Sequence, residues 1–120
     1  MRKAFLLAAA VAVLTAGYAD AHARLLHASP KVGETVVRSP TELRLWFSES
    51  IEPRESSVTL SGPGGRAIAT GRLLLDPKDK RVVVVTFPAA LPPGPYKVSW
   101  QVTSIDTHRT DGDFMFRVGP

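Results

Sequence analysis

The chain has no cysteine and very little methionine, and these absences restrict its chemistry. Its 120 residues contain no cysteine and two methionines, Met1 and Met115. Without cysteine there are no disulfides, so stability must come from a packed core alone. Soft metal sites are excluded too, because a thiolate centre needs cysteine and a thioether cluster needs several methionines. Any transition-metal site must therefore use nitrogen and oxygen donors.

The chain also lacks an apolar run long enough to cross a membrane. The run Ala4 to Ala16 follows Arg2 and Lys3, and it is shorter than the roughly 20 residues that a membrane-spanning helix needs. It leads into the small-residue pattern Ala19-Asp20-Ala21, which is typical of a signal-peptidase site. We therefore expect residues 1–21 to be a cleaved signal peptide that exports the protein from the cytoplasm. The absence of twin arginines favours secretion of an unfolded chain.

Residues 22–120 suffice for one domain and are too few for two. Basic residues are distributed along this part of the chain with acidic residues between them, and the densest run, 78–81, contains Asp79. Such a distribution is typical of a solvated surface and not of a stripe that binds nucleic acid. No G-x-S-x-G motif is present, which argues against a serine hydrolase.

Short apolar stretches separated by proline and glycine predict an all-β chain, since no segment shows helical periodicity. Leu43, Leu45 and Phe47 are apolar residues at every second position, which places them on one face of a strand. Seven or eight short strands indicate a sandwich or Greek-key barrel of two packed sheets. The expected strands are 24–28, 34–37, 42–47, 57–61, 66–75 with a break near residue 71, 81–87, 96–103 and 113–118.

Three histidines follow the predicted cleavage site: His22, His27 and His108. His22 would become the first residue, and its free α-amine and imidazole could chelate one metal ion. Asp106 and His108 are two residues apart and would project from the same side of an extended backbone. If His22 lies over this segment, the donors are one amine, two imidazoles and one carboxylate. That set suits tetragonal Cu(II).

Each of these features also has an ordinary explanation. An Asp-x-His pair at the end of a strand is commonly a hydrogen-bonded surface pair, and a histidine next to a cleavage site can occur by chance. His27 lies five residues from His22, so on a continuous strand the two side chains would face opposite ways. We expect His27 to be a strand residue that could join a metal site only through a bend or bulge.

Six segments form a set of motifs that is specific in its order and spacing: His22–Leu25, Ala28–Gly33, Leu43–Glu49, Leu91–Trp100, Val102–His108 and Gly112–Val118. They resemble those of the CopC family of periplasmic copper-binding proteins, which implies a periplasmic location. The resemblance extends over the whole predicted mature chain.

The resemblance implies an immunoglobulin-like or cupredoxin-like Greek-key β-sandwich that carries or buffers Cu(II) in copper homeostasis or resistance. By position, His22 would supply an amine and an imidazole, His108 a second imidazole and Asp106 a carboxylate. Glu49 matches a family glutamate near the site, which could accept a hydrogen bond from the metal-bound amine. On sequence pattern alone, Glu49 reads as a solvated strand end. The family also implies a partner, an inner-membrane copper importer of the CopD type.

The chain departs from the better-known branch of that family in one respect. That branch has a methionine-rich loop that forms a Cu(I) site, whereas residues 51–80 contain neither methionine nor histidine. We therefore expect a single Cu(II) site. Met115 alternates with Phe114 and Phe116, and we expect it to serve in packing.

Two other classes of function also fit parts of the pattern. A copper monooxygenase of the histidine-brace type would use the same N-terminal histidine, and an immunoglobulin-like interaction module would bind no metal. An anionic Asp106 among the ligands would stabilise Cu(II) against the reduction that oxygen activation needs. The small chain also lacks an obvious aromatic platform for a substrate. We therefore expect a protein that is not an enzyme.

Overall fold

The computed structural model describes residues 22–120, so the predicted signal peptide lies outside the described residues. This part of the chain forms nine strands and two short 3-10 turns. The strands are β1 (Leu25–Ser29), β2 (Thr35–Val36), β3 (Glu42–Phe47), β4 (Ser57–Ser61), β5 (Ala67–Ile68), β6 (Leu74–Asp76), β7 (Asp79–Thr86), β8 (Gly94–Thr103) and β9 (Arg109–Val118). The turns are η1 (Pro53–Glu55) and η2 (Pro63–Gly65). Within residues 22–120 no helix is long and apolar enough to cross a membrane.

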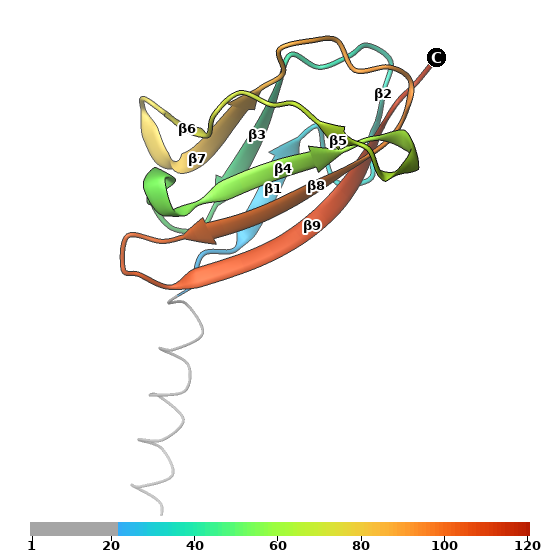
Figure 1. The fold of residues 1–120 in the computed structure, drawn as a ribbon. Coiled ribbons are helices and arrows are strands. Elements are labelled where there is room, and N and C mark those ends of the chain that lie inside the picture. The colour runs from blue at the N-terminus through green and yellow to red at the C-terminus, as the bar shows by residue number, and fades with distance from the viewer. Residues whose placement is uncertain (1–21) are drawn as a thin grey trace, which may run out of the picture.

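The strands form two sheets that face each other (Figure 1). One sheet has the order β1-β3-β7-β6 and the other β2-β9-β8-β4-β5. The pairings are antiparallel except that β2 pairs with β9 in parallel. The predicted fold class is confirmed: the chain is an all-β, immunoglobulin-like sandwich of two sheets.

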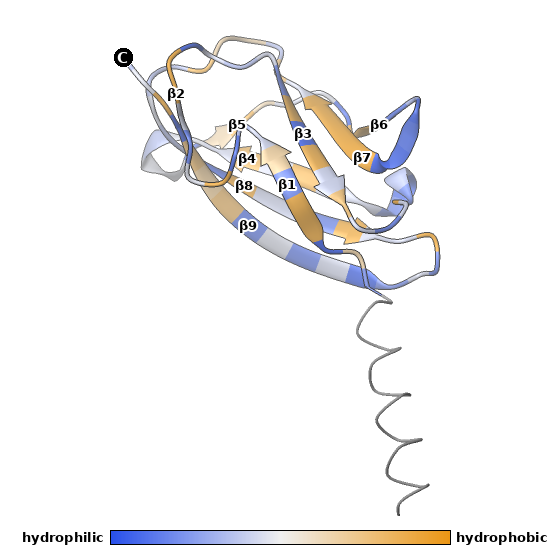
Figure 2. Ribbon diagram, turned by 180° about the vertical axis from the view of Figure 1, so that it is seen from behind, coloured by the Kyte–Doolittle hydropathy of each residue, from blue (hydrophilic) through white to orange (hydrophobic). Residues whose placement is uncertain are grey.

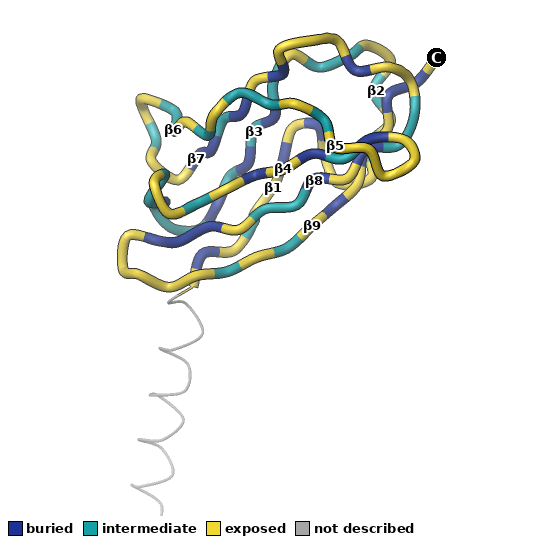
Figure 3. Tube along the Cα trace, viewed as in Figure 1, coloured by how far each residue is buried: buried dark blue, intermediate teal, exposed yellow. Residues whose placement is uncertain are grey.

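The core lies between the two sheets and is built by alternation along the strands. In β3, Leu43, Leu45 and Phe47 are at most 1% exposed, and the residues between them are partly exposed. Tyr96 and Val98 of β8 supply fully buried side chains from the opposite sheet. Figure 3 shows this alternation of buried and exposed positions along the strands. Because strand side chains point to opposite faces in turn, each sheet presents one apolar face to the core.

The valine run of β7 lies inside its sheet, between β3 and β6, a position that suits its continuous apolar character. Val83 and Val85 face the core, and Val82 is only 3% exposed although it faces outward. Figure 2 shows β7 as apolar over most of its length.

The segment 66–75, predicted as one strand with a break near Gly71, forms two separate strands. β5 pairs with β4 in one sheet, and β6 pairs with β7 in the other, so the chain crosses between sheets at the break. The Gly71 amide donates to the Thr86 carbonyl at 2.8 Å. A Cβ on Gly71 would lie 2.4 Å from Thr86 Oγ1, so a larger residue here would require the Thr86 side chain to change its rotamer.

Two expectations about the last strand are wrong. β9 begins at Arg109 and not at Asp113, because it pairs with β8 over ten positions from Gly94↔Val118 to Thr103↔Arg109. The first residues of β9 are polar and carry no apolar alternation, so the pattern did not reveal them. Met115 does not pack in the core but is 52% exposed on the outer face, while Phe114 and Phe116 are buried.

Candidate metal centre

The loop between β8 and β9 brings Asp106 and His108 together, although not in the predicted way. The two residues do not lie on an extended strand. They lie in a tight reversal in which the Ser104 amide donates to the His108 carbonyl at 2.9 Å and the Thr107 amide to the Ser104 carbonyl at 2.8 Å. Thr107 has a φ of 73°, in the left-handed region. The hairpin must reverse here, so the alternation argument does not apply to this pair.

The base of the loop is fixed to the sandwich. Ser104 is 1% exposed and forms a β-bridge with Ile51, which is 2% exposed. The Ile105 amide donates to the Ser50 carbonyl at 3.1 Å, and the Glu52 amide to the Thr103 carbonyl at 2.8 Å. These contacts tie the loop to the segment that follows β3, so the loop has a defined position on the domain.

Asp106 is held by its neighbours within the loop. The Ser104 hydroxyl donates to Oδ1 of Asp106, and Oδ2 of Asp106 lies 3.3 Å from Nδ1 of His108. The Ser104 hydrogen bond, together with the contact to His108, lowers the pKa of Asp106 below its usual value. The side chains of Asp106 and His108 are about half exposed, so a solvated ion can reach both.

His22 lies against the same loop. Its imidazole packs edge to face on that of His108, with ring centroids 4.6 Å apart and an interplanar angle of 69°. The start of β1 runs beside β9 (Figure 1), and the Thr110 hydroxyl donates to the Ala23 carbonyl at 3.0 Å. The three predicted residues from opposite ends of the chain are therefore neighbours: His22 contacts His108, and His108 contacts Asp106.

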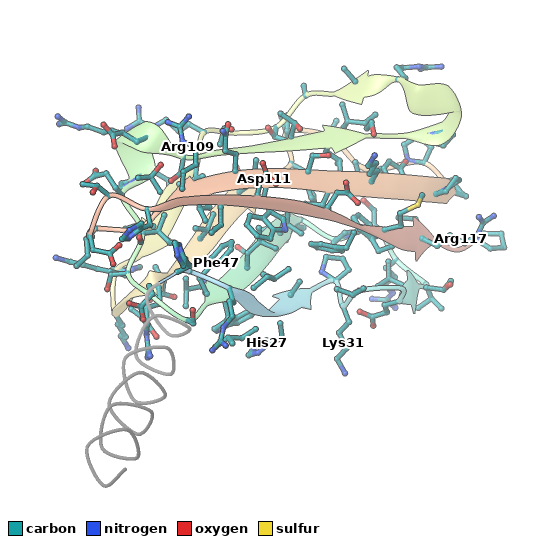
Figure 4. The ribbon with its side chains drawn as sticks, turned by 90° about the horizontal axis from the view of Figure 1, so that it is seen from below. His27, Lys31, Phe47, Arg109, Asp111 and Arg117 are labelled. Carbon is teal, nitrogen blue, oxygen red and sulfur yellow. The ribbon has the colours of Figure 1, made fainter. Side chains whose placement is uncertain are left out.

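His27 lies elsewhere. The pairing of β1 with β3 shifts register between Leu25 and His27, so a bulge is present at this point. The bulge turns Leu25 and Ala28 toward the core, and His27 stacks on Trp46 with ring centroids 4.3 Å apart. Figure 4 shows His27 projecting from the outer side of β1. The bulge therefore pairs His27 with an aromatic ring and not with the other histidines.

Glu49 is partly buried on the segment after β3. Asp79 is the main reason that the pKa of Arg81 is raised, and the charge of Glu49 adds to it. Among the hydrogen bonds of residues 22–120, none joins the Glu49 carboxylate to His22, Asp106 or His108. Within the same residues, no group of three or more His, Asp or Glu side chains is arranged to hold a metal ion. The candidate residues form two contacting pairs, His22 with His108 and His108 with Asp106.

The sequence of this chain matches a known protein family. The family model of the CopC domain matches residues 25–119. The chain belongs to the CopC domain family. It is 34% identical over 113 residues to the protein YobA of Escherichia coli K12, covering 91% of each chain. It is 29% identical over 122 residues to copper resistance protein C of Pseudomonas syringae pv. tomato, covering 98% of this chain and 96% of the relative.

Solved structures of the family share the sandwich. CopC from Methylosinus trichosporium OB3b superimposes with a TM-score of 0.77 at 29% identity, covering 82% of this chain and 95% of that one. PcoC from Escherichia coli, described as a methionine-rich copper resistance protein, gives a TM-score of 0.74 at 28% identity, covering 82% and 99%. This CopC-domain chain differs in composition, since Met115 is its one methionine after Met1.

The spacings at the CopC-domain site fit adjacent donors of one ion. Bonds of about 2.0–2.2 Å at right angles put neighbouring donor atoms roughly 3 Å apart. Nδ1 of His108 and Oδ2 of Asp106 are 3.3 Å apart. Two imidazoles bound side by side to one ion have centroids roughly 4.5 Å apart, given bonds of about 2.0 Å. The His22 and His108 centroids are 4.6 Å apart, which is close to that spacing.

Proposed function

We propose that this CopC-domain chain is a periplasmic copper carrier or buffer that holds one Cu(II) ion in copper homeostasis or resistance. The observation that carries the proposal is the contact between His22 and His108 at 4.6 Å, in a chain that belongs to the CopC domain family. The two histidines are 86 residues apart in sequence, so only the fold brings them together. The contact supports a shared ligand role.

Cleavage after Ala21 completes the ligand set in this proposal. It would free the amine of His22 beside its imidazole and create a chelating pair. His108 would add an imidazole and Asp106 a carboxylate. These hard and borderline nitrogen and oxygen donors favour Cu(II), which leads the divalent affinity order. Glu49 would accept a hydrogen bond from the metal-bound amine and so orient it.

In this proposal, the protein binds one copper ion, has no Cu(I) site and is not an enzyme. A Cu(I) site built from thioethers needs several methionines, and residues 22–120 contain one, exposed on the outer face. An anionic Asp106 among the ligands would resist reduction of the ion. The Cu(II)-loaded protein should therefore form no more peroxide with ascorbate than free buffer does, and it should not cleave polysaccharide. The recipient of the copper would be an inner-membrane importer of the CopD type.

The test compares two forms of the protein. Mass spectrometry of the exported protein should show a chain that begins at His22, and Cu(II) titration should give one ion per chain with nitrogen hyperfine splitting in its electron paramagnetic resonance spectrum. A matched form with one alanine added before His22 keeps every side chain but moves the amine. It should bind Cu(II) much more weakly. Equal affinity of the two forms, or no binding by either, would refute the proposal.

A further inference from the structure

The first residues of the predicted mature chain are anchored to the sandwich through one buried residue. Ala23 is 2% exposed and belongs to the core cluster. The residues on either side, His22 and Arg24, are exposed. A terminal segment is usually poorly ordered unless contacts hold it. Here the backbone of residues 22–24 is held by side chains from both sheets.

The first of these side chains is Ser48, directly after β3. Its hydroxyl accepts a hydrogen bond from the Arg24 amide at 2.8 Å and donates to the His22 carbonyl at 3.3 Å. The Ser48 amide donates to the Arg24 carbonyl at 2.9 Å. Ser48 therefore extends the hydrogen bonding between the β1 and β3 segments past the end of β3, to residues 22–24.

The second is Thr110 of β9, in the opposite sheet. Its hydroxyl donates to the Ala23 carbonyl at 3.0 Å. Thr110 lies two residues after His108, at the stem of the loop. The carbonyls of the first two mature residues thus accept hydrogen bonds from hydroxyls of opposite sheets. This arrangement fixes the direction of the backbone at His22 relative to His108.

We infer that Ser48 and Thr110 are positioning residues that form an N-terminal clamp. The clamp holds His22 against His108 before any metal ion arrives. This inference rests on the proposed Cu(II) site for its effect on binding, although the clamp itself is a property of the metal-free protein. Without the clamp, residues 22–24 would have to become ordered when the ion binds, and that loss of conformational entropy would weaken binding.

The binding test uses variants that keep or remove the hydroxyl. Thr110→Val keeps the shape of the side chain and should weaken Cu(II) binding about tenfold (about 1.4 kcal/mol). Thr110→Ser, which keeps the hydroxyl, should stay within about twofold of the original protein, and Ser48→Ala should behave like Thr110→Val. Thr59→Val and Ser57→Ala, both exposed on β4, are matched controls that should leave the affinity unchanged. All variants should give the same nitrogen hyperfine pattern, because the ligands are unchanged.

A second measurement tests the clamp without copper. In the metal-free protein that begins at His22, the Arg24 amide should be protected from hydrogen exchange and the backbone of residues 22–24 should be ordered by nuclear magnetic resonance. Ser48→Ala should lose the protection of the Arg24 amide, because it removes the acceptor of that amide. Ser48→Ala and Thr110→Val should both lose the order of residues 22–24, and the β4 controls should keep both properties. A disordered segment in the original protein, or copper affinities in the clamp variants equal to the controls, would overturn the inference. If the original protein bound no Cu(II), the proposed function would fail, and the exchange experiment would still decide the clamp.

Discussion

At the scale of single residues, His108 contacts both other candidate ligands, so its removal should affect Cu(II) binding most. His108→Ala should lower the affinity by more than about 100-fold, since loss of a supporting residue already costs 10–100-fold. His27→Ala serves as the matched control and should change the affinity by less than about twofold, because His27 stacks on Trp46 outside the site. Competition with a chelator of known affinity measures both. A larger loss in His27→Ala would mean that the ligands are assigned wrongly.

Asp106 allows a prediction about stability and pH in the metal-free protein. The hydrogen bond from Ser104 is the main reason that its pKa is lowered from 3.8. A carboxyl group whose pKa is lower in the folded than in the unfolded state stabilises the fold at pH values above its unfolded-state pKa. This stability is lost as the pH falls through its folded-state pKa. Ser104→Ala should therefore unfold at lower denaturant concentration than the original protein at pH 7, and the difference should shrink below about pH 4.

The Asp106→Asn background is the control for that prediction, because asparagine does not titrate. There, Ser104→Ala should have a smaller effect on the denaturant midpoint, and the effect should not depend on pH. The Ser104 hydroxyl also lies 3.2 Å from the His108 carbonyl, and this contact accounts for the part that remains. An effect of equal size in both backgrounds at pH 7 would show that the carboxylate is not involved.

At the scale of elements, the stem of the β8–β9 hairpin depends on Gly112. Trp100 lies opposite Gly112 in the pairing and packs edge to face on Phe47, with ring centroids 5.2 Å apart. A Cβ on Gly112 would lie 2.6 Å from Trp100 Cζ2. Gly112→Ala should therefore destabilise the domain by about 1–3 kcal/mol, the usual range for overpacking. Denaturant unfolding measures this, and Asp111→Ala, exposed on the same strand, should change stability by less than about 0.5 kcal/mol.

The elements also show how far sequence reasoning reaches. β3 and β4 have the predicted bounds, 42–47 and 57–61, because buried apolar residues alternate with more exposed ones along each strand. β9 was predicted too short, since its first residues are polar and are strands only through pairing with β8. The predicted neighbours Asp106 and His108 do meet, but in a loop. The contacts of Ser48 and Thr110 could not be predicted, because they depend on register between segments far apart in sequence.

At the scale of the whole molecule, the buried core of the sandwich supports the residues that are proposed to bind copper, and those residues lie at its surface. The buried core between the sheets includes Ala23 and extends to Ile51 beside Ser104, so the binding loop and the first mature residues rest on the same packed interior. The ligand candidates themselves stay exposed. A domain of this size can bury enough surface to fold without a metal. In the proposed function, the copper ion would be cargo that the folded domain gains and releases.

This separation leads to a prediction about thermal stability. An ion that binds only the folded state stabilises it by about 2.7 kcal/mol when its free concentration is 100 times the dissociation constant. For a domain of about 100 residues, each kcal/mol raises the melting temperature by about 4–8 °C, so Cu(II) should raise it by roughly 10–20 °C. Calorimetry of the protein that begins at His22 measures the shift, and His108→Ala should lose most of it. A metal-free interaction module would show no shift, and that result would exclude a copper carrier.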